Sequence, residues 1–180
     1  MDRKTDRRRF LKQSGEAAAI TAAVSTLGAV HTFAEEKPDK VTLGIIGCGG
    51  IMGNHVQGLV SRRAAVSIAW LCDVDPRQMD KIAQHISGFQ TPPKRSIRFE
   101  QVVKDKTVDA VIIATPHHWH APIALRAMAE GKDVYIEKPI SHVYNEGHAI
   151  IQAAKKHRRI VQQGSQMRSS PVTEKAGKLL

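Results

Sequence analysis

Short apolar runs alternate with longer segments of helical spacing from Lys40 onward. The apolar runs predict six β-strands, at 41–47, 66–72, 96–99, 108–114, 133–137 and 160–163. The run at 108–114 is rich in β-branched residues throughout, which is typical of a strand buried on both faces of a parallel sheet. This strand therefore belongs to the interior of a parallel sheet.

The segments between the strands carry helical periodicity. Apolar residues recur at helix spacing from Met52 to Val60, and a second helix is predicted over 123–130, ending before Gly131. Further helical patterns follow at 150–154 and 173–180. Strict alternation of strands and helices implies right-handed crossovers. We therefore expect an α/β domain built on a doubly wound, Rossmann-like parallel sheet.

The first 34 residues differ from this pattern. Arginines at 7–9 precede Phe-Leu-Lys, an apolar run spans 17–30, and small residues precede Glu35. A basic region, a short apolar region and a small-residue cleavage site are typical of a secretory signal. The paired arginines resemble a twin-arginine signal, with Asp6 where Ser or Thr is usual. We expect 1–34 to be read by the twin-arginine export machinery and 35–180 to be periplasmic; a basic tail or an uncleaved anchor is the alternative.

Composition and charge exclude further classes of partner and of site. The chain has 180 residues, 27 Lys+Arg against 17 Asp+Glu, a formal net charge of +10 and 4% aromatic residues. Because the basic residues are scattered and stacking platforms for bases are scarce, we expect no nucleic-acid partner.

Two cysteines, Cys48 and Cys72, are too few for a disulfide scaffold or a Cys-rich zinc site. We expect both to be small buried thiols, with a disulfide as the alternative.

A glycine-rich turn follows the first predicted strand and leads directly into a helix. Gly47 allows the tight turn, and Gly49 lets the backbone approach a pyrophosphate. The helix start at Gly50, Ile51 and Met52 supplies unpaired N–H groups and positive potential. The third glycine of the usual pattern is displaced, because Met52 occupies its position and glycine comes one residue later. We expect these five residues to bind a dinucleotide.

An acidic residue, Asp73, ends the second predicted strand. A carboxylate at this place accepts hydrogen bonds from the ribose diol of NAD and repels the 2′-phosphate of NADP. We therefore expect NAD as the cofactor, with NADP as the alternative. Asp75 precedes Pro76 and is expected to cap the next helix; a capping role alone is the other interpretation of Asp73.

Two more segments lie at the carboxyl ends of predicted strands, where open α/β sheets bind ligands. The strand at 108–114 leads into the sequence TPHHWH, and the strand at 133–137 leads into EKP. Imidazoles at i, i+1 and i+3, here His117, His118 and His120, do not converge on one ion, and no carboxylate lies nearby in sequence. We expect no metal site, with His118 facing solvent.

The glycine-rich turn, the T-P-x-x-W-H stretch, the E-K-P motif and the sequence QGSQMR at 163–168 occur in this order. Together they resemble the N-terminal half of the glucose–fructose oxidoreductase/inositol dehydrogenase (Gfo/Idh/MocA) family. The resemblance covers the chain from Lys40 onward. It implies that this part binds NAD(P), and that the α+β substrate domain of the family, which carries its own catalytic residues, is absent from this sequence.

The resemblance also implies roles for individual residues. Lys138 and His120 are expected to be catalytic, with Lys138 near the nicotinamide and the reacting carbinol. Residues expected to border the cofactor are Thr115, Pro116, Trp119 and Glu137. Glu137 is also expected to shape its turn, and a cis peptide bond is expected before Pro139.

Three functions follow from these expectations. The first is an exported oxidoreductase that transfers hydride between NAD and a sugar, a polyol or a related hydroxyl compound. The second is a redox-neutral, NAD-dependent glycosidase of the same superfamily. The third is a truncated, non-catalytic dinucleotide-binding module. We expect a homo-oligomer only for a full-length enzyme.

Overall fold

The computed structural model describes residues 40–88 and 91–178, which belong to one compact unit, 38–180. The predicted signal peptide at 1–34 lies outside the described residues. The strands are β1 (Val41–Ile46), β2 (Val66–Cys72), β3 (Lys94–Ser96), β4 (Ala110–Ile113), β5 (Asp133–Ile136) and β6 (Val161–Gln163). The helices are α2 (Gly50–Ser61), α3 (Pro76–His85), α4 (Phe99–Lys104), α5 (His120–Ala129), α6 (Tyr144–His157) and α7 (Pro171–Gly177), with 3₁₀ turns η1 (His117–Trp119) and η2 (Gln166–Ser169).

The strands form one sheet in the order β3-β2-β1-β4-β5-β6, and every pairing is parallel. The chain winds outward from β1 through β2 to β3, then returns to β4 and winds the other way. This change of direction places a switch point between β1 and β4, the place where doubly wound sheets bind ligands at their carboxyl edge. The predicted α/β fold class is confirmed.

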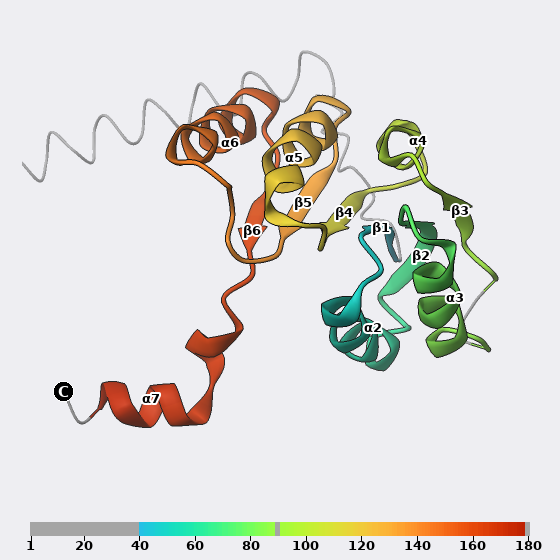
Figure 1. Ribbon diagram of the computed structural model, residues 1–180, viewed down its shortest axis with the longest axis horizontal. Coiled ribbons are helices and arrows are strands. Elements are labelled where there is room, and N and C mark those ends of the chain that lie inside the picture. The colour runs from blue at the N-terminus through green and yellow to red at the C-terminus, as the bar shows by residue number, and fades with distance from the viewer. Residues whose placement is uncertain (1–39, 89–90, 179–180) are drawn as a thin grey trace, which may run out of the picture. The chain divides into compact units, whose positions relative to one another are not determined.

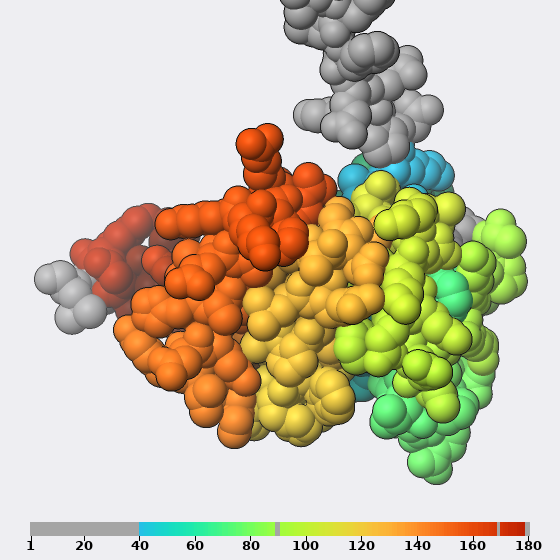
Figure 2. Space-filling view, turned by 90° about the horizontal axis from the view of Figure 1, so that it is seen from above, coloured from blue at the N-terminus to red at the C-terminus, as the bar shows by residue number. Residues whose placement is uncertain are grey.

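Helices cover both faces of the sheet. In Figure 1, α2 and α3 lie on one side of it, while α4, α5 and α6 lie on the other. Figure 2 shows α4, α5 and α6 (yellow-green, yellow and orange) packed next to one another over their face. Successive strand residues therefore enter two separate cores: Ile45 packs with Met52 and Val56 of α2, while Ile46 packs with Ile123 of α5.

The third predicted strand was misplaced. It was expected at 96–99, whereas β3 ends at Ser96 and Phe99 begins α4. Val102 and Val103 are fully buried and Phe99 packs against the same core. Their i, i+3, i+4 spacing is helical, but so short a helix gives little periodicity beside a run that also resembles a strand.

The predicted helix ends agree well with the structure. Gly131 has a positive φ of 79°, directly after the C-cap of α5, as expected for a glycine there. The carboxylate of Asp75 accepts a hydrogen bond from the backbone N–H of Arg77, and Pro76 occupies the first turn, so the predicted cap is confirmed. None of the helices in the described part of the chain combines the length and the apolar run needed to cross a bilayer.

Lys132 is a buried lysine that ties the start of β5 to the loop before β4. Its Nζ donates to the carbonyl oxygens of Asp105, at 2.8 Å, and Val108, at 2.7 Å. Burial lowers the pKa of the Lys132 amine. The cost of burying this amine is offset because it satisfies two backbone carbonyls that no longer face water.

Replacing this buried amine tests the point. We expect Lys132→Met to lower the free energy of unfolding by about 2 kcal/mol, because the Val108 carbonyl loses its donor and the Asp105 carbonyl keeps only the backbone N–H of Val108. Lys106 on the same surface has a side chain that is 83% exposed, so Lys106→Met should change stability by less than about 0.5 kcal/mol. Urea denaturation followed by circular dichroism measures both variants, and equal stability of the two would contradict the assignment.

Candidate nucleotide-binding site

The glycine turn after β1 needs glycine at one position for two reasons. Gly47 has a φ of 91°, in the left-handed region, and its N–H donates to the carbonyl of Cys72 at 2.8 Å. A Cβ on Gly47 would lie 2.6 Å from the carbonyl group of Ala114. The turn therefore packs directly against the backbone at the end of β4, at the switch point between β1 and β4.

The helix that follows the turn presents an uncapped end. Gly49 is the N-cap of α2, and among the described residues no side chain caps it. The first N–H groups of a helix have no partner within it, and they carry the positive end of its dipole. Space is open around the Cα atoms of Gly49 and Gly50. This end of α2 is suited to an anionic group such as a phosphate.

Met52 and Gly53 explain the displaced glycine. The Met52 side chain is completely buried in the core beneath α2, and its N–H donates to the carbonyl of Gly49 at 3.0 Å. No atom lies within 4 Å of a Cβ placed on Gly53. The helix therefore does not need a third glycine for close packing. Because its N–H is already paired and its side chain is buried in the core, Met52 does not supply the unpaired N–H group expected from the sequence.

Asp73 ties the end of β2 to the glycine turn. Its Oδ2 accepts from the backbone N–H of Cys48 at 2.7 Å, and its Oδ1 accepts from the N–H of Asp75 at 2.9 Å. Each carboxylate oxygen accepts more than one hydrogen bond, so both keep capacity for the hydroxyls of a ribose. The carboxylate thus fastens the turn to the end of β2 and keeps acceptor capacity at the carboxyl edge of the sheet.

A cavity of about 450 Å³ opens where these elements meet at the carboxyl edge of the sheet. It brings together six predicted site residues, which are Gly47, Gly49, Asp73, Thr115, Pro116 and Trp119. Its wall also contains residues that sequence reasoning did not assign to the site, namely Val74, Ile97, Arg98, Phe99 and His118. Most of these come from the β3–α4 connection, whose misplacement as a strand hid them. His118 is exposed, as expected, but lies on the rim of the cavity.

The Thr115 hydroxyl indicates whether a polar ligand fits this cavity. Its Oγ1 is the buried side-chain polar atom that lacks a hydrogen-bond partner within the described residues. Buried hydroxyls are nearly always paired, because leaving one unpaired costs free energy. A ligand seated in the cavity would supply the missing partner. The hydroxyl, the Asp73 carboxylate and the uncapped helix therefore fit a dinucleotide.

His120 does not face this cavity. It is buried, with Nδ1 2.7 Å from the carbonyl oxygen of Pro139 and Nε2 2.9 Å from that of Thr115. Both ring nitrogens are engaged by backbone, so neither is presented to a substrate. The ring links the start of α5 to two loops, and the geometry supports a positioning role for His120 in place of the catalytic role expected from the sequence.

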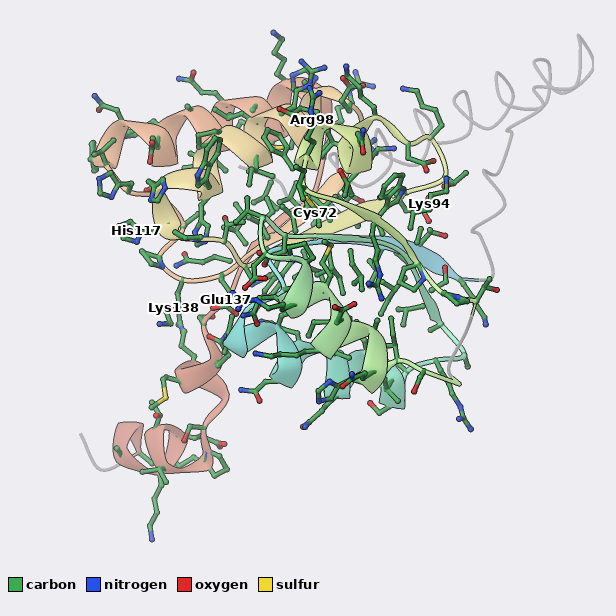
Figure 3. The ribbon with its side chains drawn as sticks, turned by 45° about the vertical axis from the view of Figure 1, so that its right-hand side comes forward. Cys72, Lys94, Arg98, His117, Glu137 and Lys138 are labelled. Atoms are coloured by element: carbon green, nitrogen blue, oxygen red, sulfur yellow. The ribbon has the colours of Figure 1, made fainter. Side chains whose placement is uncertain are left out.

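The E-K-P turn forms a second group of residues after β5. The peptide bond between Lys138 and Pro139 is cis, as the resemblance implied. Glu137 is buried while Lys138 is exposed, and Figure 3 shows the two residues next to each other on the turn. Neither lines the cavity described above. Burial raises the pKa of Glu137, but hydrogen bonds from His55 and the Lys138 backbone outweigh it, so that the pKa lies below its usual value.

The two cysteines are buried free thiols, as predicted. Cys48 Sγ lies 3.7 Å from the carbonyl oxygen of Cys72. Burial raises the pKa of both thiols to about 12, so neither is a nucleophile near neutral pH. Within 40–88 and 91–178, no group of three or more His, Cys, Asp or Glu side chains is arranged to hold a metal.

A doubly wound parallel sheet, a glycine turn against an uncapped helix and a carboxylate after β2 define a dinucleotide-binding domain. Comparison with known proteins gives the family. The profile of the oxidoreductase family with an NAD-binding Rossmann fold, Gfo/Idh/MocA, matches residues 41–165. The chain belongs to this family and is an NAD-binding domain of it.

Two curated relatives and one solved structure illustrate the similarity. A glycosyl hydrolase family 109 protein of Shewanella pealeana is 31% identical over 172 residues, covering 85% of this chain and 38% of the relative. An alpha-N-acetylgalactosaminidase of Shewanella oneidensis is 28% identical over 173 residues, covering 83% and 37%. The WlbA dehydrogenase of Chromobacterium violaceum, in complex with NADH and UDP-GlcNAcA, has the same fold, with a TM-score of 0.65 at 21% identity over 71% of this chain and 36% of that one. The chain thus spans less than two fifths of each relative.

Substitutions at two glycines of the turn distinguish a loss of stability from a loss of NAD binding. Gly47→Ala is expected to destabilise the domain by about 3 kcal/mol, because it combines a left-handed φ with a backbone clash. Gly49→Ala should leave stability within about 0.5 kcal/mol and weaken NAD binding, because its methyl group enters open space beside the cavity. Thermal unfolding and calorimetric titration with NAD measure the two effects. Unchanged NAD affinity in Gly49→Ala would contradict this placement of the cofactor.

Proposed function

We propose that this chain is the cofactor domain of an exported enzyme that transfers hydride between NAD and a sugar, a polyol or a related hydroxyl compound. The observation that carries the proposal is the cavity at the β1/β4 switch point, where the Asp73 carboxylate and the unpaired Thr115 hydroxyl meet the uncapped end of α2. The UDP-GlcNAcA bound by the similar WlbA dehydrogenase supports a sugar-like substrate.

Within this proposal the residues have separate tasks. The start of α2 at Gly50 and Ile51 binds the pyrophosphate, and Asp73 binds the adenosine ribose. Thr115, Pro116 and Trp119 line the wall of the cavity beyond the ribose. When bound, NAD supplies the hydride acceptor, nicotinamide C4. The exposed Lys138 amine orients the substrate hydroxyl and takes part in moving its proton.

A redox-neutral glycosidase is the second candidate, and the curated relatives favour it by their names, a family 109 glycosyl hydrolase and an alpha-N-acetylgalactosaminidase. In such an enzyme, a sugar carbon would be oxidised transiently and the aglycone would leave by elimination. Water would then add to the resulting unsaturated ketone, and the hydride would return from the cofactor. The cofactor domain would then perform the same hydride transfer in both directions. Both candidates require the remainder of an enzyme longer than this chain.

Export belongs to the proposal as well. Paired arginines and the apolar run within 1–34 support a twin-arginine signal and a periplasmic location. NAD is made in the cytosol, so an exported enzyme must fold around its cofactor before crossing the membrane. We therefore expect slow release of NAD from the complete enzyme.

Cofactor choice tests the nucleotide site in this chain. Calorimetric titration of the 180-residue protein should give NAD an affinity at least about tenfold above that of NADP, because the Asp73 carboxylate repels a 2′-phosphate. Asp73→Asn should largely abolish the preference, whereas Asp75→Asn should keep it, because asparagine caps a helix as well as aspartate does. A preference that survives in Asp73→Asn would remove Asp73 from the ribose site.

Lys138 is tested in the full-length enzyme. Lys138→Met should lower turnover by about 100-fold or more, because proton movement at the substrate hydroxyl loses its assistance. NAD affinity should stay within about threefold, since Lys138 does not line the cavity at the β1/β4 switch point, where Asp73 and Thr115 lie. Near-normal turnover would exclude a catalytic role for Lys138.

The same enzyme separates the two candidate reactions. A nitrophenyl glycoside of N-acetylgalactosamine is mixed with the enzyme and its retained NAD, and both nitrophenol and NADH absorbance are followed. Nitrophenol release without net NADH identifies the redox-neutral glycosidase. Stoichiometric NADH from a free sugar or polyol, with no glycoside cleavage, identifies the dehydrogenase.

A further inference from the structure

The Glu137 carboxylate is buried, and hydrogen-bond donors from several elements surround it. His55 Nε2 of α2 lies 2.6 Å from Glu137 Oε1, and the Gln166 side-chain amide of η2 donates to the same oxygen. The Tyr135 hydroxyl is 3.4 Å from Oε1. The other oxygen, Oε2, accepts from the backbone N–H of Lys138 at 3.1 Å. A buried carboxylate with this many donors is held in one orientation.

The surroundings of Glu137 are closely packed. A Cβ on Gly164, directly after β6, would lie 2.6 Å from the Tyr135 hydroxyl and 3.1 Å from Glu137 Oε1. The His55 ring packs edge-on against Tyr135, with ring centroids 5.2 Å apart. The end of β6, the ring of His55 and the side chain of Tyr135 therefore enclose the carboxylate from three directions.

His55 connects this cluster to the nucleotide site. It lies on α2, the helix whose first turn begins at Gly50 beside the cavity. A helix is rigid over so short a distance, so the position of its N-terminus sets the position of His55. The bond between His55 and Glu137 is thus a side-chain link between the phosphate-binding helix and the E-K-P turn.

We propose that His55 is a positioning residue for Lys138: its Nε2 holds the Glu137 carboxylate, and the carboxylate holds the backbone N–H of Lys138, which fixes the direction in which the lysine leaves the turn. This inference rests on the proposed function, in which the Lys138 amine faces the substrate. It assigns a role to a helix residue that belongs to neither the glycine turn nor the E-K-P motif. Gln166 supports the same carboxylate through a second hydrogen bond to Oε1.

The test uses the full 180-residue chain and three variants. His55→Phe keeps an aromatic ring against Tyr135 but removes the donor to Glu137. His55→Gln restores a donor, because its amide nitrogen lies near the place of the histidine Nε2. His148→Phe is the matched control. His148 also packs edge-on against a tyrosine, Tyr144, with ring centroids 4.9 Å apart, but its side chain is exposed and it lies on α6, outside the group of donors around Glu137.

The readout is the Lys138 backbone amide, observed by NMR through its chemical shift and hydrogen exchange, with the Lys132 amide as internal control. We expect His55→Phe to shift the Lys138 resonance and to accelerate its exchange about tenfold, because the carboxylate loses its anchor. His55→Gln should restore most of both effects, and His148→Phe should change neither. If His55 acted only by packing its ring against Tyr135, His55→Phe would keep that contact and leave the Lys138 amide unchanged. An unchanged Lys138 amide in this variant therefore overturns the proposal.

Two further results keep the test decisive. If His55→Phe does not fold, His55→Asn replaces it, since its shorter amide does not reach Glu137; an unchanged Lys138 amide in His55→Asn overturns the proposal equally. Titration with NAD then separates the two claims. If NAD leaves the Lys138 side-chain resonance unmoved while His55→Phe shifts the Lys138 amide, the positioning role is supported and the catalytic placement of Lys138 is overturned. If NAD moves the side-chain resonance while His55→Phe leaves the amide unchanged, only the positioning role is overturned.

Discussion

Burial of β1 on both faces is the constraint on which the rest of the domain depends. The strand lies between β2 and β4, and its successive residues Ile45 and Ile46 enter separate cores beneath α2 and α5. A parallel sheet buried in this way aligns the carboxyl ends of all its strands at one edge. The polar groups that follow those strands are thereby gathered, although they are far apart in sequence.

The glycine turn shows how closely this edge is built. Gly47 carries a left-handed φ and lies against the carbonyl group of Ala114, so the loop after β1 and the loop after β4 meet without side chains between them. Asp73 then fastens the turn to the end of β2 through the N–H of Cys48. The same contacts that complete the fold leave a cavity bordered by a helix N-terminus, a carboxylate and an unpaired hydroxyl. Residues that complete the fold at this edge therefore also line the cavity.

The two groups of site residues are held by different physics. The cavity is largely apolar with a few polar groups on its wall, as nucleotide sites usually are. The E-K-P turn is instead organised around the buried charge of Glu137, whose burial is offset by donors from α2, β5, η2 and the backbone of the turn itself. Because such a charge is costly when any donor is lost, it fixes the backbone of its turn more firmly than packing alone would. His55 joins the two groups through α2.

Much of this was predictable from the sequence, because local patterns carry the physical cause with them. The β-branched run at 108–114, the glycine turn at 47–50, the Asp75 cap and Gly131 each specify a backbone conformation through their own side chains or lack of one. What the sequence left out depends on contacts between distant segments. The burial of His120 between two carbonyls, the cavity wall at 97–99 and the bond from His55 to Glu137 exist only once the sheet has brought α2, β4 and β5 together. The sequence by itself determined the fold, the glycine turn and the class of cofactor, since these follow from the spacing of residues along the chain. Only the tertiary structure decided which side chains meet, because a hydrogen bond depends on distance in space rather than on separation in sequence.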